Sequence, residues 1–128
     1  MGLFGNSEEK AEKEAAAQVE LDRLVALALP DLGAAIMPAF GPGGLQTRSG
    51  HRQGPAEVTK WLMSSFSGKT KYTQPLLRPV MEGLQALDNA GLVESRGFGD
   101  RGAATTYHPT RAGEEALADG SVAQRLEV

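Results

Sequence analysis

The most regular alternation of apolar and polar positions in this chain lies between Thr73 and Leu117. Apolar side chains recur there at the spacing of one helix face. They are Leu76, Leu77, Val80, Met81, Leu84 and Leu87. The helix begins either at Thr73, a favourable N-cap, or near Arg78, because the ring of Pro79 opposes the carbonyl four residues before it. Gly91 can adopt the left-handed conformation that ends such a helix.

Two strands and another helix are predicted after this glycine. Leu92–Arg96 and Thr105–His108 have the composition of short strands. Gly97–Gly102 between them is polar and rich in glycine, which predicts a turn. Pro109–Leu117 then starts a helix. The predicted fold class is therefore α+β, mainly α with a small β-hairpin.

Three motifs in this region resemble a known family. They are Leu87–Val93 (Leu-Asp-Asn-Ala-Gly-Leu-Val), Asp100-Arg101 in the turn, and Thr110–Gly113 (Thr-Arg-Ala-Gly). Their order is similar to that in the second half of the winged helix-turn-helix domain of MarR-like and PadR-like bacterial transcriptional regulators. The resemblance implies a winged helix-turn-helix, here with an extra N-terminal helix, in which the helix before the hairpin is the DNA recognition helix.

Helices are also predicted upstream of this region. Asn6–Leu29, Asp31–Phe40 and Ala56–Phe66 have apolar residues at helical spacing. Gly41–Pro55 has too many glycine and proline residues for a regular element, which predicts a flexible loop. The predicted units are an acidic N-terminal helical extension (1–18), a winged-helix domain (19–120) containing the loop 41–55, and a C-terminal tail (121–128).

Two of these segments leave alternatives open. In the first helix, either only the second half packs on the domain and the start is frayed, or the whole length pairs with another subunit. In the loop, Arg48, His51 and Arg52 form either a basic arm that touches phosphates or an ordinary surface connection.

Charge is spread unevenly along a chain whose formal net charge is −3. Residues 1–45 contain three basic and seven acidic residues, residues 46–111 nine and five, and residues 112–128 one and four. The basic excess thus lies on the predicted winged-helix segment, where a phosphate-binding surface needs it. An excess of this size is equally compatible with ordinary variation.

The residue types present also restrict the location and the chemistry. The chain has no cysteine, so disulfides and thiolate chemistry are excluded, and no apolar run is as long as a membrane span. We therefore expect a cytoplasmic protein with no membrane contact.

The chain also lacks the motifs of common catalytic and metal sites. His51 and His108 are far apart in the sequence. A phosphate-binding loop ending in Gly68-Lys69-Thr70 requires glycine at the position that Met63 occupies. We expect no enzyme activity, cofactor or metal.

The favoured function is that of a DNA-binding transcriptional regulator, with double-stranded DNA as partner. The candidate base-reading side chains are Thr73, Gln74 and Arg78, and the candidate phosphate-binding side chains are Lys69, Lys71 and Arg101. Glu82, one turn past Arg78, counts against DNA binding. Ser121–Val128 is too short for the terminal helices that build MarR-like dimers, so a homodimer would use the N-terminal helix. The alternative is a winged-helix protein-protein interaction module without DNA binding, which the acidic flanks and the pI of 5.4 suit.

Overall fold

The computed structural model describes residues 2–42, 44–45, 54–67, 69–96 and 106–127. Its elements in chain order are α1 (Gly2–Ala26), α2 (Leu29–Ile36), the 3-10 helix η1 (Met37–Phe40), α3 (Pro55–Leu62), α4 (Thr70–Asn89), β1 (Val93–Arg96), β2 (Thr106–Pro109), α5 (Arg111–Asp119) and α6 (Val122–Leu126). The strands pair antiparallel, with Val93 opposite Pro109. The predicted fold class, mainly α with a small β-hairpin, is confirmed. The series α2, α3, α4, β1, β2 has the element order of a winged helix-turn-helix, preceded by α1.

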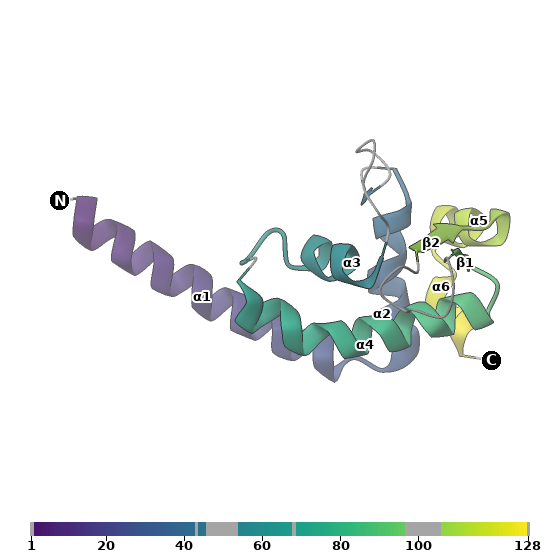
Figure 1. The fold of residues 1–128 in the computed structure, drawn as a ribbon, viewed down its shortest axis with the longest axis horizontal. Coiled ribbons are helices and arrows are strands. Elements are labelled where there is room, and N and C mark those ends of the chain that lie inside the picture. The colour runs from purple at the N-terminus through teal and green to yellow at the C-terminus, as the bar shows by residue number, and fades with distance from the viewer. Residues whose placement is uncertain (1, 43, 46–53, 68, 97–105, 128) are drawn as a thin grey trace.

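Helix α4 is the element around which the others are arranged (Figure 1). It contacts α1, α2, α3 and β1. Helix α1 runs beside the first half of α4 and extends well beyond its N-terminal end, whereas the hairpin, α5 and α6 gather at the opposite end. The two ends of α4 therefore have different surroundings, a projecting helix at its start and the hairpin at its finish.

The inner face of α4 forms the centre of the hydrophobic core. Its buried side chains are Tyr72, Leu76, Val80, Leu84 and Leu87. Helix α2 packs closely on this face because Gly83 has no side chain: a Cβ there would lie 2.5 Å from Cδ1 of Ile36. Burial of this face leaves the opposite side of α4 free for another role.

The start of α4 differs from both sequence-based expectations. The helix begins at Thr70, so Thr73 lies inside its first turn and is not the N-cap. Pro75 and Pro79 are also inside the helix and do not delay it until Arg78. Each proline lacks an amide donor and costs helix stability. The buried side chains on the same turns offset that cost by packing against α1, α2 and α3.

The end of α4 is closed as predicted by Gly91, whose φ is 76°. The amide of Leu92 donates to the carbonyl of Leu87 at 2.9 Å, and the amide of Gly91 donates to that of Asp88 at 3.0 Å. This pair of hydrogen bonds is a Schellman motif, and the accompanying apolar contact is supplied by two buried leucines, Leu87 and Leu92. The motif turns the chain directly into β1.

The Thr-x-x-Gly motif joins α5 to this same turn. Thr110 caps α5 by accepting a hydrogen bond from the amide of Gly113 at 3.0 Å. The Thr110 hydroxyl donates to the carbonyl of Gly91 at 2.6 Å, and its amide donates to that of Leu92 at 3.1 Å. Gly113 has no side chain to separate α5 from the Leu92 carbonyl, against which a Cβ would collide. The motif thus fixes the hairpin relative to α4.

Other predicted boundaries shift by a few residues. The helix predicted at Asn6–Leu29 is α1, which both starts and ends earlier than predicted. Its end is earlier because Pro30 occupies the first turn of the next helix, α2. The helix predicted at Asp31–Phe40 is divided into α2 and η1. The helix predicted at Ala56–Phe66 is the shorter α3, and the predicted tail 121–128 contains α6.

Candidate nucleic-acid interface

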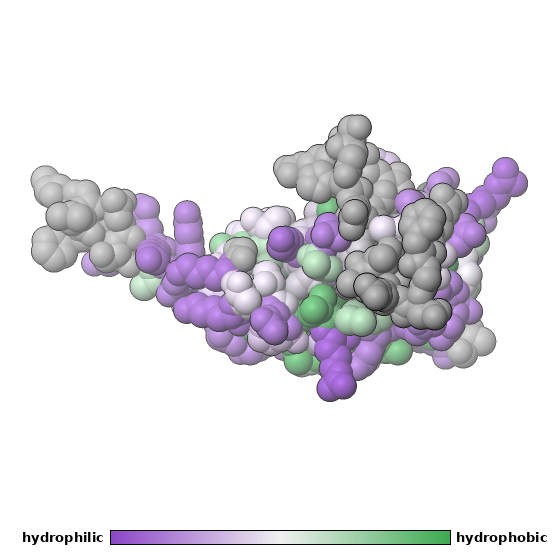
Figure 2. Space-filling model, in the orientation of Figure 1, coloured by the Kyte–Doolittle hydropathy of each residue, from purple (hydrophilic) through white to green (hydrophobic). Residues whose placement is uncertain are grey.

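The polar side of α4 is turned away from the core, and we call this surface the outer face of α4. It is formed by Lys71, Gln74, Arg78, Met81, Glu82 and Gln85, all of which are exposed. A shallow groove runs along it, with Leu77 as an additional lining residue. Figure 2 shows a small apolar patch bordered by hydrophilic side chains in the region of α4. The outer face is therefore accessible and mixed in character.

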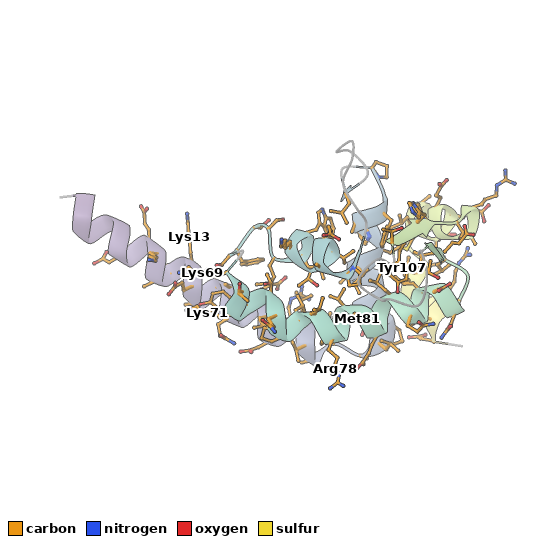
Figure 3. All side chains as sticks on the ribbon, in the orientation of Figure 1. Lys13, Lys69, Lys71, Arg78, Met81 and Tyr107 are labelled. Carbon is orange, nitrogen blue, oxygen red and sulfur yellow. The ribbon has the colours of Figure 1, made fainter. Side chains whose placement is uncertain are left out.

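Gln74 and Arg78 provide free hydrogen-bond donors on this face. They are four residues apart and therefore lie one turn apart on the same side of the helix. Figure 3 shows the Arg78 side chain pointing away from the body of the protein. Among the described residues, neither side chain has a hydrogen-bond or ion-pair partner. Both are exposed, as expected from the sequence, and their binding to a ligand stays a prediction.

Two other residues of α4 lie differently from the prediction. Thr73 is half-buried, and its hydroxyl lies 3.5 Å from the carbonyl of Lys69 as a weak donor. It is therefore presented less openly than Gln74. Met81 was expected in the apolar stripe but is 48% exposed. It follows the buried Val80 by one residue, and one step rotates a side chain by about 100° around a helix, which places Met81 beyond the edge of the buried stripe.

Lys69 and Lys71 at the start of α4 both lie close to an acidic side chain of α1. The Nζ atom of Lys69 forms an ion pair with Oε1 of Glu14 on α1, and the Nζ atom of Lys71 lies 4.0 Å from the same oxygen. Lys71 also lies over the ring of Tyr72, 5.0 Å from its centroid. One carboxylate therefore bridges the two lysines that the sequence assigned to phosphate binding. Figure 3 shows these two lysines close together at the start of α4, beside α1.

Glu14 and Lys69 favour each other's ionised forms. The hydrogen bond from Lys69, followed by the charges of Lys69 and Lys71, lowers the pKa of Glu14. The hydrogen bond to Glu14 in turn raises the pKa of Lys69. Glu14 and Lys69 are therefore both charged at neutral pH, and the acidic side chain from α1 partly compensates the positive charge of the lysine pair.

The remaining basic candidates lie outside the described residues. These are Arg101 in the predicted wing and Arg48, His51 and Arg52 in the predicted loop. The paired strands that would carry a wing are present, in the register Arg96 opposite Thr106. The described part of the site therefore consists of the outer face of α4 and the lysine pair with its acidic neighbour.

Sequence reasoning missed Glu14, which lies 55 positions before Lys69. A signal for it was present in α1. Glu14 precedes the buried Ala17 and Leu21 by three and seven residues, so it continues their stripe toward α4. A charged residue on the buried stripe of a helix indicates a partner of opposite charge on the helix that covers it.

Features of other functional classes are scarce in the described residues. A groove of about 780 Å³ between η1 and α5 is lined by apolar side chains, with Glu114 as the charged residue in its wall. The described residues contain no group of three or more potential metal ligands. No described helix has the length and apolarity needed to cross a membrane.

The chain was also compared with known proteins. No family model, no curated protein and no solved structure matches it. The resemblance to MarR-like and PadR-like regulators therefore rests on the three motifs around the hairpin, of which Asp100-Arg101 lies outside the described residues.

Proposed function

We propose that the protein binds double-stranded DNA through the outer face of α4 and acts as a transcriptional regulator of the winged helix-turn-helix type. The observation that carries this proposal is the pair Gln74 and Arg78, exposed on the helix that precedes the hairpin and without partners in the described part of the chain. A donor on such a helix is what a major-groove reader needs, because base edges there present acceptors in a sequence-dependent pattern.

The roles within this proposal follow from the chemistry of each side chain. Arg78 would donate two hydrogen bonds to a guanine edge, and Gln74 would bond to an adenine edge. Lys69 and Lys71, at the start of α4, would contact backbone phosphates, which fixes the register without reading the sequence. The hairpin, attached through Thr110 to the end of α4, would lie beside the same groove.

The proposal is tested by titrating labelled duplexes with the purified protein at several salt concentrations. The duplex ligand is first selected from a random pool. Arg78→Ala is expected to remove about 1–3 kcal/mol of discrimination between the selected duplex and a scrambled one. Lys71→Ala is expected to weaken binding to both duplexes alike and to reduce the salt dependence by about one unit of log–log slope.

Arg23→Ala is the matched control for these variants. Arg23 is on α1, 55% exposed, and is bound to Glu20 through Nε at 2.6 Å. Its removal changes the net charge as much as Arg78→Ala does but leaves the outer face of α4 intact. Equal effects of the two substitutions on discrimination would contradict a base-reading role for Arg78, and no binding to any duplex at low salt would contradict the proposal as a whole.

Palindromic operators require two copies of a reader, and in this proposal α1 joins them. The supporting observation is that the described residues 8–13 of α1 are all exposed and that Val19 is 68% exposed. Sedimentation of the full chain and of the Val19→Glu variant tests this arrangement. A wild-type dimer that the substitution dissociates is expected, and a monomer at all concentrations would contradict it.

A second candidate function is a protein-protein interaction module. Met81 and Leu77 give the groove on the outer face an apolar centre, and Glu82 places a negative charge in it. This composition resembles a protein interface more than a phosphate-binding surface. The duplex titration separates the two candidates, because a module of this kind would show no salt-dependent binding to duplex DNA.

A further inference from the structure

The contact between Glu14 and the start of α4 has an unusual composition for a surface ion pair. A single carboxylate oxygen is shared by Lys69, the N-cap of α4, and Lys71 in its first turn. The first turn of α4 contains no acidic residue of its own. Glu14, supplied by another helix, is therefore the anion held at this end.

The chemistry of the position is that of a backbone phosphate. A phosphate oxygen, like a carboxylate oxygen, accepts charge-assisted hydrogen bonds from lysine ammonium groups. Two lysines that converge on one oxygen therefore mark a position where one anion binds at a time. When the carboxylate of Glu14 fills that position, a phosphate must displace it before it can use either lysine.

The remainder of α1 strengthens this competition. Residues 8–14 contain four acidic and two basic residues, and α1 continues past the start of α4 toward its own N-terminus (Figure 1). A phosphate backbone approaching the lysines from that end would meet a net negative helix. At physiological salt such repulsion acts over about 8 Å, so it is confined to the end of α4 next to α1.

We propose that Glu14 occupies the phosphate position of Lys69 and Lys71, so that the acidic half of α1 is an intramolecular competitor of the DNA backbone. This inference rests on the proposed function and adds its regulation: release of the Glu14 side chain from Lys69 and Lys71 exposes the two lysines together. The contact is solvent-exposed, with 48% of the Lys69 side chain and 32% of the Glu14 side chain accessible. Exposed ion pairs are weak and exchange readily with competing ions.

The test compares Glu14→Gln with Glu12→Gln in the full chain. Both substitutions remove one negative charge from an exposed part of α1, but Glu12 has no hydrogen-bond or ion-pair partner among the described residues. The probe is a labelled duplex of random sequence, titrated at salt concentrations from about 0.05 to 0.2 M, the range over which phosphate contacts change affinity most visibly. Circular dichroism melting of each variant confirms that the fold is retained.

Glu14→Gln is expected to bind the duplex about two- to tenfold more tightly than wild type at low salt, because a phosphate no longer has to displace a carboxylate from Lys69 and Lys71. Glu12→Gln is expected to change the affinity much less. In a Lys69→Ala, Lys71→Ala background the two glutamate substitutions are expected to have the same effect on affinity. The two lysines that Glu14 contacts in wild type are then missing.

These outcomes distinguish competition by Glu14 from DNA binding itself. If wild type binds DNA and Glu14→Gln behaves like Glu12→Gln, the competition is contradicted while DNA binding stands. If Glu14→Gln retains its advantage after both lysines are removed, the effect does not pass through them and the inference is again overturned. If no variant binds any duplex at low salt, both the proposed function and this inference are overturned.

Discussion

Replacing Gly113 by alanine tests how the hairpin is fixed to α4. A Cβ at this position would lie 2.8 Å from Cε of Met37, 2.9 Å from the carbonyl carbon of Leu92, and closer still to the Leu92 oxygen. Met37 ends in a flexible methyl group, but the Leu92 carbonyl belongs to the backbone and accepts a hydrogen bond from Thr110. The overlap can be relieved only by moving α5 away from the turn after α4.

The cost of this movement can be worked out from the contacts it breaks. Overpacking of a close contact costs about 1–3 kcal/mol. Displacement of α5 also lengthens the hydrogen bonds from Thr110 to the carbonyls of Leu92 (3.1 Å) and Gly91 (2.6 Å), each worth about 1 kcal/mol net. The higher helix propensity of alanine returns about 1 kcal/mol. Gly113→Ala should therefore lower the free energy of unfolding by about 2 kcal/mol or more.

Urea denaturation followed by circular dichroism measures this difference, and Gly33→Ala provides the matched control. Gly33 is also a buried glycine within a helix, but the atom nearest to its added Cβ is a terminal methyl of Leu126, which can rotate away. The control should therefore lose about 1 kcal/mol at most. If Gly113→Ala is as stable as wild type or more stable, α5 does not pack against the Leu92 carbonyl and our description of the hairpin attachment is wrong.

Two further predictions concern the core and the pH dependence. Leu84 is fully buried on the inner face of α4, so Leu84→Ala should lower the free energy of unfolding by about 2–5 kcal/mol, and a loss below about half a kilocalorie per mole would show that α4 faces another way. Burial, with a smaller contribution from the charge of Asp88, raises the pKa of Tyr107 above its usual value of 10.0. Because the neutral phenol is favoured in the folded state, this contribution to stability is complete below pH 10.0 and is lost as the pH rises toward the folded pKa. The free energy of unfolding of wild type should therefore fall relative to that of Tyr107→Phe as the pH rises above 10.0. A difference between the two proteins that does not change with pH would contradict the shift.

Local backbone chemistry explains why the region around the hairpin was predictable. Gly91 is placed between a helical apolar pattern and a short strand, and glycine is the residue that adopts a left-handed conformation without strain. Thr110 and Gly113 are close in sequence and act on each other directly. Signals of this kind depend on neighbours along the chain, which a single sequence displays.

The features that escaped prediction depend on contacts between distant segments. The start of α4 at Thr70 overrides two internal prolines because buried side chains on those turns pack against other helices. The exposure of Met81 follows from which side of α4 the other helices cover. Glu14 reaches Lys69 only because α1 runs beside α4, and the stripe that Glu14 continues does not by itself show which helix covers it.

Entry of the outer face of α4 into the major groove, as proposed above, is tested most directly by recording amide spectra of the isotope-labelled full chain. The spectra are recorded during titration with a selected duplex at low salt. We expect the largest perturbations on Thr70–Arg78 and smaller ones toward the end of α4. Perturbations centred elsewhere, for example on the groove between η1 and α5, or none at all, would contradict it.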